Sequence, residues 1–312
     1  MRSLSIICLA WCAVLTAGLF GQAQTPTFRA VATGVTVDVS VQSGTRPVTN
    51  LRIGDFELLD NGVPQVIADL TYGKLPIDIT VALDISYSVR GSMLERLRRA
   101  VGQLMRDLRP DDRLRLMMFN ARVARVVDYA SDPAAIDAAM TTAVAGGGTS
   151  LNDAISLALV SSRAPGRRQL VVVFTDGNDA TSSTSMATLS EVANRTTATL
   201  TVVTPSAIVT GGNPFGFLTN PALMGLPTAT TRTGVVRTAY AGLTSSTGGS
   251  VVPFQVGEDL GAVFRRVLDA FRSTYVLHFV PTGVGQGGFH ELIVTVKRSN
   301  ARVTARRGYF GG

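Results

Sequence analysis

The chain has 312 residues, of which 46% are hydrophobic and 16% are charged, and its formal net charge is +7. This composition is that of a folded globular protein and excludes an intrinsically disordered one, and the length allows one large domain or two modest ones. Basic residues can indicate a nucleic-acid partner, but no interleaving of aromatic and basic residues supports one here. We expect instead a solvated basic surface of the kind that can face anionic components of a cell envelope.

The first 23 residues have the pattern of a secretion signal. Arg2 gives a charged start, an apolar run extends from Leu4 to Phe20, and Gly21-Gln22-Ala23 has the small-x-small form of a cleavage site. A retained membrane anchor is the alternative, but the apolar run is short for a spanning helix. We expect residues 1–23 to be removed, and the protein to be exported to the periplasm or secreted to the cell surface. Both cysteines lie in this segment, so the exported chain would have no disulfide.

Residues 24–76 are expected to form a small β module. The run Val35–Val41 alternates apolar and polar residues with a period of two, which is typical of a half-buried strand. Asp60-Asn61-Gly62 is a tight-turn signal between the strand-like runs 56–59 and 63–67.

Residues 77–272 alternate between strand-like and helix-like runs, which predicts an α/β domain with a doubly wound, mainly parallel, Rossmann-like sheet covered on both faces. The expected strands are 77–83, 114–119, 123–129 (an antiparallel partner), 170–174, 198–203 and 250–254. The expected helices are one that Ser92 caps and Pro110 ends, and those at 133–140, 150–162, 186–195, 240–247 and 260–271.

The last segment, residues 273–312, returns to a β pattern, with strands expected at 275–280, 291–296 and 303–309. A few short strands rarely form a stable unit by themselves. We therefore expect residues 24–76 and 273–312 to form one β-sandwich, into which the α/β domain is inserted.

Three loops of the α/β domain offer hard oxygen ligands. Asp84, Ser86 and Ser88 follow the first strand, Thr149 precedes a helix, and Asp176 follows the strand 170–174. Because functional loops of a parallel sheet gather at the carboxyl ends of its strands, we expect these five side chains to converge on one edge. Carboxylates and hydroxyls without His or Cys are typical of a hard-cation site. The alternative, that these residues only cap helices and turns, does not explain two acids at the ends of two buried strands.

This pattern resembles the metal-ion-dependent adhesion site of the von Willebrand factor type A domain, which has Asp-x-Ser-x-Ser, then Thr, then Asp. Asp84, Ser86, Ser88, Thr149 and Asp176 match it without substitution. The resemblance implies that the three hydroxyls bind the cation directly, or in one of two ligation states, and that the two carboxylates act partly through water. It also implies that the sixth position is left for an acidic residue of a protein partner. Mg²⁺ suits such a site, and Mn²⁺ and Ca²⁺ are further candidates.

The flanking β segments resemble an exported acidobacterial group of proteins related to this domain. The similar stretches are Leu51–Gly62, Tyr275-Val276-Leu277 and Ala305–Phe310. This extends the resemblance over nearly the whole exported chain, although it implies no function for the group.

Nucleotide binding and catalysis are both weaker interpretations. The run Gly146–Ser150 could hold a phosphate at a helix N-terminus, but it lacks the Gly-Lys-Ser/Thr ending of a phosphate-binding loop. The two histidines, His278 and His290, both lie in the C-terminal β segment, and the exported chain would have no cysteine nucleophile. Asp179 could assist the metal, but a turn cap is its simpler role. We expect a protein that is not an enzyme.

The stretch 205–237 is long for a loop in a compact domain, and it starts at the carboxyl end of a predicted strand, on the metal side. It carries apolar residues such as Phe215, Phe217 and Met224 among Gly and Pro. Two roles are left open: part of a partner-binding surface or a lid over the metal, or packing onto the protein itself.

The leading functional hypothesis is an exported, non-enzymatic adhesion module that captures an acidic group of a protein partner through Mg²⁺. After signal cleavage it would not be an integral membrane protein, although it could associate with the envelope. The alternative is a structural or assembly subunit of an envelope complex, in which the metal only stiffens the loops. A metal-dependent hydrolase is a distant third, because no general base is expected near the site.

Overall fold

The computed structural model describes residues 34–311, apart from 131–132, 161–165, 177–178 and 207–238. The predicted signal, residues 1–23, and nearly all of the predicted insertion, residues 205–237, lie outside the described residues. Among the helices of the described residues, none has the length and apolar character needed to cross a membrane.

A six-stranded sheet forms the centre of the α/β part of the protein. Its strands, in spatial order, are β11 (Val251–Phe254), β10 (Thr199–Pro205), β9 (Arg168–Phe174), β6 (Ile77–Asp84), β7 (Arg113–Phe119) and β8 (Val123–Ala130). All neighbours pair in parallel except β7 and β8, which are antiparallel. The predicted mainly parallel α/β fold class is confirmed. Because both faces of this sheet are covered, its central strands β6 and β9 are buried along their whole length.

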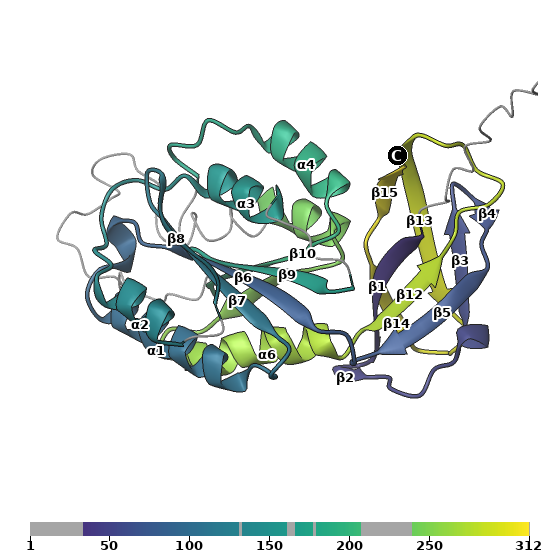
Figure 1. Ribbon diagram of the computed structural model, residues 1–312, viewed down its shortest axis with the longest axis horizontal. Coiled ribbons are helices and arrows are strands. Elements are labelled where there is room, and N and C mark those ends of the chain that lie inside the picture. Colours follow the sequence, from purple (N-terminus) through teal and green to yellow (C-terminus); the bar gives the residue numbers. More distant parts are fainter. Residues whose placement is uncertain (1–33, 131–132, 161–165, 177–178, 207–238, 312) are drawn as a thin grey trace, which may run out of the picture. The chain divides into compact units, whose positions relative to one another are not determined.

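Helices cover both faces of this sheet (Figure 1). One face is covered by α1 (Ser92–Asp107), α2 (Pro133–Thr141) and α6 (Leu260–Arg272), and the other by α3 (Leu151–Val160) and α4 (Met186–Arg195). The buried side chains of α1, such as Leu97, Val101 and Leu104, recur at helical spacing and face the sheet. The predicted cap of this helix is wrong: Gly91, at φ +68°, holds the cap position, and Ser92 is already helical.

Two smaller antiparallel sheets are built from both ends of the described chain. The first contains β14 (Arg302–Ala305), β1 (Val35–Ser43), β12 (Tyr275–Phe279) and β5 (Ile67–Tyr72), with β2 (Arg46–Pro47) beside β1. The second contains β15 (Gly308–Gly311), β13 (Gly288–Val296), β3 (Phe56–Asp60) and β4 (Val63–Pro64). Apolar residues of both sheets, including Val37, Leu58 and Leu277, share one buried cluster. The N-terminal strands therefore obtain their core and most of their partners from the C-terminal segment.

Two runs that were predicted to be single strands are each divided between these two sheets. The run 63–67 contributes β4 to one sheet and the start of β5 to the other, and the buried Gln65 lies at the crossing. The Gln65 amide donates to the carbonyl of Thr282 at 2.9 Å and accepts from its N–H at 2.9 Å. The run 303–309 is interrupted in the same way by the buried Arg306, whose Nε donates to the carbonyl of Gly308 at 2.7 Å. At both positions the chain passes from one sheet to the other, and the strand hydrogen bonds are interrupted. A buried polar side chain forms hydrogen bonds with the backbone there instead.

A buried polar cluster joins β3, β13 and β15. The carboxylate of Asp60, which is 0% exposed, lies 2.8 Å from Nδ1 of His290 and accepts a hydrogen bond from the Tyr309 hydroxyl at 2.7 Å. Burial, followed by the hydrogen bond to Asp60, raises the pKa of the Tyr309 hydroxyl above its usual value. The cluster ties the C-terminal strand to an N-terminal one inside an apolar surrounding.

Replacing Asp60 with Ala should therefore be costly, because it removes the carboxylate that both His290 and Tyr309 contact and leaves these two groups only each other. We expect Asp60→Ala to lower the free energy of unfolding by about 3 kcal/mol. Denaturant unfolding followed by circular dichroism measures this. The matched control is Asp69→Ala, because Asp69 is an exposed residue of β5. It should change the free energy of unfolding by less than about 0.5 kcal/mol. Equal effects of the two substitutions would contradict a stabilising role for the cluster.

Candidate functional site

The parallel pairing of β6 with β9 determines where the first acidic residue of the predicted site lies. Leu83 pairs with Phe174, so the next residues, Asp84 and Thr175, leave the sheet side by side. The Thr175 hydroxyl donates to Oδ2 of Asp84 at 2.8 Å. Asp84 is 0% exposed, and the strand register thus fixes a buried carboxylate at the carboxyl edge of the sheet.

Four of the five predicted site residues form one continuous chain of contacts. The N–H of Ser86 donates to Oδ1 of Asp84 at 2.8 Å. The hydroxyls of Ser86 and Ser88 lie 3.1 Å apart, and the Ser88 hydroxyl donates to Oδ1 of Asp176 at 2.7 Å. The short 3-10 turn η2 (Tyr87–Val89) places both serines on the side that faces the two acids. The loops after β6 and β9 are therefore joined through hydroxyl and carboxylate oxygens alone.

The fifth predicted residue, Thr149, reaches the same region through its backbone. Its side chain is largely buried, and its carbonyl accepts hydrogen bonds from the N–H groups of Ala180 and Thr181 at 2.8 and 3.1 Å. The hydroxyls of Ser150 and Thr181 lie 2.7 Å apart. These contacts join the loop before α3 to the loop that follows Asp176.

Asp179 acts as a cap in this arrangement. Its carboxylate accepts hydrogen bonds from the hydroxyl of Ser182 and from the N–H of Asn152 in the first turn of α3. The side-chain oxygen of Asn152 accepts in turn from the buried hydroxyl of Tyr240 at 2.6 Å. Asp179 thus fixes the loop beside the site, and its contacts agree with a turn and helix cap.

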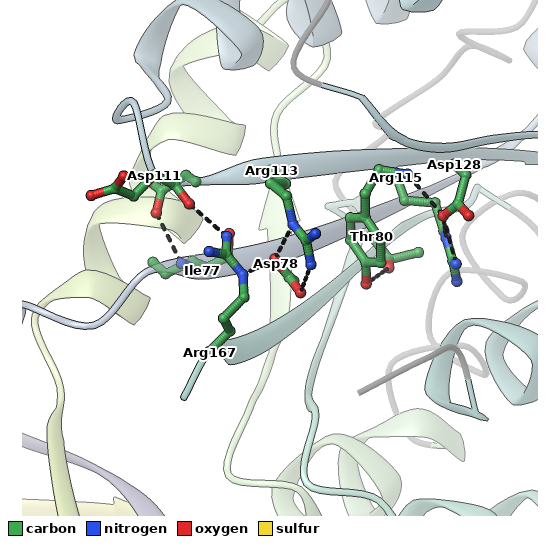
Figure 2. A network of polar contacts seen from close by, with 10 residues as sticks. Ile77, Asp78, Thr80, Asp111, Arg113, Arg115, Asp128 and Arg167 are labelled. Atoms are coloured by element: carbon green, nitrogen blue, oxygen red, sulfur yellow. Dashed lines mark hydrogen bonds and ion pairs between the residues drawn. The ribbon is translucent and has the colours of Figure 1, made fainter. Parts of the chain in front are cut away.

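Two buried aspartates on β6 have opposite electrostatic surroundings. Asp78, near the start of the strand, forms ion pairs with Arg113 at 2.6 Å and with Arg167 at 2.5 Å, as Figure 2 shows. Burial opposes ionisation there, but the hydrogen bonds from the two arginines lower the pKa of the Asp78 carboxyl below its usual value. The positive charge that Asp78 needs is supplied by the protein itself.

Asp84, at the other end of the strand, has no such partner. Burial first, and then the nearby carboxylate of Asp176, raise the pKa of the Asp84 carboxyl to about 7, against the hydrogen bonds from Ser86 and Thr175. Within the described residues no Arg or Lys forms an ion pair with Asp84, and no group of three His, Cys, Asp or Glu side chains offers an alternative metal centre. Two carboxylates and several hydroxyls are a donor set that fits a hard divalent cation.

Two features of this edge were not identified as functional in the sequence. Thr175 fixes the orientation of Asp84. Knowledge of the parallel register would have predicted this contact, because Leu83 pairs with Phe174 and Thr175 is the next residue. The second feature is a stacked pair, Tyr87 and Arg90, beside the two serines. Its only signal in the sequence is an aromatic residue between Ser86 and Ser88, which by itself is ambiguous.

The raised pKa of Asp84 has a consequence for stability that can be measured without metal. Since the folded-state pKa lies above the unfolded value, the folded protein binds the proton more tightly, and stability falls as pH rises toward about 7. In chelator, the free energy of unfolding of the wild type should fall by about 2–3 kcal/mol more between pH 5 and pH 8 than that of Asp84→Asn. The variant lacks this change because Asn has no carboxyl group that can ionise. Denaturant unfolding at the two pH values provides the comparison. Parallel pH profiles would contradict this assignment.

Comparison with known proteins finds similarity for the α/β part. Residues 78–213 match the family model of the von Willebrand factor type A domain. Among solved structures, an aerotolerance-related membrane protein from Bacteroides fragilis is 16% identical, with a TM-score of 0.45, over 62% of this chain and 98% of that one. BatB from Bacteroides thetaiotaomicron is 18% identical over the same shares, with a TM-score of 0.46. Proximal thread matrix protein 1 from mussel byssus, with a zinc-occupied MIDAS motif, is 14% identical over 67% of this chain and 48% of that one, with a TM-score of 0.44. Residues 78–213 of this chain are thus similar to the von Willebrand factor type A domain.

Proposed function

We propose that the protein is a binding module that captures an acidic group of a protein partner through a divalent cation. The residues that would hold the cation are Asp84, Ser86, Ser88, Thr149 and Asp176. The observation that carries this proposal is the contrast between the two buried aspartates of β6. Asp78 is neutralised by two arginines, whereas Asp84 faces a second carboxylate and forms no ion pair with an Arg or Lys of the described residues, so a bound cation would supply the positive charge there.

The residues around Asp84 account for how the site would be held ready. Thr175 and the backbone N–H of Ser86 fix both carboxylate oxygens of Asp84, which leaves little freedom to reorganise on binding. The Ser88 hydroxyl, which donates to Asp176, can turn its lone pairs toward a cation when one binds. The bound cation supplies the positive charge that a partner carboxylate needs. Mg²⁺ suits a site that has few carboxylates and keeps water, and Mn²⁺ or Ca²⁺ could replace it.

The same residues support a binding role over catalysis. The only acids in the contact chain are the two that would hold the cation, and both histidines lie on strands of the antiparallel sheets. Export, to the periplasm or by secretion to the cell surface, is proposed from the N-terminal signal pattern. The alternative is an assembly subunit in which the cation only joins the loops after β6 and β9. The Ser88–Asp176 contact favours it, because it brings these loops close enough for one cation to join them.

The proposal predicts that Asp84→Ala abolishes both cation binding and cation-dependent partner capture. Metal binding is measured by calorimetric titration of the purified protein with Mg²⁺ and Mn²⁺. Capture is measured by pull-down from envelope extract, with Mg²⁺ or with chelator. Asp111→Ala is the matched control, because Asp111 is an exposed aspartate beside the opposite end of the sheet, just before β7. It should leave both measurements unchanged.

Two results would contradict this function in different ways. Capture that persists in chelator with Asp84→Ala would show that the partner does not need the cation. Loss of thermal stability in chelator without release of any partner would favour the assembly subunit.

A further inference from the structure

Beside the proposed cation site lies an exposed aromatic side chain. Tyr87 stands between Ser86 and Ser88, and 57% of it is exposed. Its backbone N–H donates to the carbonyl of Gly147 at 3.1 Å, which fixes the turn in place. A large exposed ring in a turn that the backbone holds so firmly is unusual, because aromatic side chains gain most from burial.

The ring of Tyr87 supports a guanidinium group. Cζ of Arg90 lies 4.0 Å from the ring centroid, and Nε of Arg90 donates to the carbonyl of Ala145 at 3.2 Å. The guanidinium is thus held by the ring on one face and by a carbonyl at one edge. Arginine has five N–H donors, so most of those of Arg90 are left for a ligand.

Gly146 lies against the stacked pair. A Cβ on Gly146 would lie 3.4 Å from Nη2 of Arg90 and 3.8 Å from the Tyr87 ring. The stacked pair therefore packs directly over this backbone. The loop before Thr149 and the loop after Asp84 together hold one oriented cationic group.

No carboxylate neutralises this group in the part of the chain that the structure describes. Arg90 forms no ion pair there, and neither do several other arginines such as Arg99. Arg90 differs from Arg99 because a ring and a carbonyl hold its guanidinium in one orientation. The whole chain is also basic, with a net charge of +7. The stacked pair thus places an oriented positive charge two residues along the chain from Ser88.

We propose, on the basis of the proposed function, that Arg90 binds a second carboxylate of the same partner. The partner would then be an acidic peptide segment with two carboxylates close together, one on the cation and one on Arg90. A planar guanidinium held by stacking binds a carboxylate through two parallel hydrogen bonds. Residues two apart are separated by about 7 Å along an extended chain. Acidic residues at positions i and i+2 of an extended partner segment point to the same side, so we assign this spacing to the two carboxylates of the partner.

The test compares two synthetic peptides, acetyl-Gly-Gly-Asp-Gly-Asp-Gly-amide and the same peptide with Asn in place of the second Asp. Binding to the full chain is measured by titration followed by NMR, in Mg²⁺ and in chelator. The peptide with two acids should bind about twofold more tightly than the other from statistics alone, because either acid can occupy the cation. With the wild type in Mg²⁺ we expect this advantage in affinity to be about five- to tenfold. Arg90→Gln should reduce it to about twofold.

Two further variants separate recognition from charge and from folding. Arg99→Gln removes an exposed arginine of α1 and should keep the full advantage. Arg90→Lys keeps the charge but loses the planar donor pair, so it should keep only part of the advantage.

The outcomes distinguish the two proposals. If the wild type binds neither peptide in a Mg²⁺-dependent way, the proposed function fails, and the role of Arg90 fails with it. If both peptides bind in Mg²⁺ and Arg90→Gln keeps the full advantage, the proposed function stands and the inference is overturned. If Arg90→Gln also loses Mg²⁺ affinity, Arg90 supports the metal loops, and its role as a carboxylate site is likewise overturned.

Discussion

The pairing of β6 with β9 is the constraint on which the proposed site depends. It brings the ends of two buried strands together, and with them the carboxylates of Asp84 and Asp176. A buried carboxylate next to another one is unfavourable, and local hydrogen bonds only partly offset the cost. The fold keeps this arrangement because both strands are buried along their whole length, and most of that buried surface is apolar and lies away from the site.

The other end of β6 shows what the protein does with a buried carboxylate that serves stability. Asp78 lies six positions before Asp84 on the same strand, and two arginines surround it (Figure 2). Both aspartates are almost fully buried, so burial alone does not separate their roles. They differ in what lies beside the carboxylate: two arginines beside Asp78 and a second carboxylate beside Asp84. Because both residues lie on one strand of one sheet, this contrast supports the proposed role of Asp84 as a cation ligand.

Much of this arrangement could be predicted from the sequence, since it depends on local patterns. The alternation of apolar runs and amphipathic segments gave the mainly parallel sheet, and the strand ends located Asp84 and Asp176. The predictions failed where a single polar residue changes the path of the chain. Gln65 and Arg306 divide expected strands between two sheets, because their hydrogen bonds to distant backbone groups are invisible in a local pattern. The Arg90 stack could not be predicted for the same reason, since it requires the loop at Ala145.

The pairing of β1 with β12 and β14 has a consequence for synthesis on the ribosome. These strands come from opposite ends of the described chain. More than two hundred residues must therefore be synthesised after β1 before β12 and β14 are available to pair with it. The α/β domain, by contrast, can assemble its sheet from strands that follow one another along the chain. Throughout that interval the edges of β1 and β3 are open to pairing with other chains. The nascent protein is therefore most exposed to aggregation at its earliest strands, and its final segment removes that hazard.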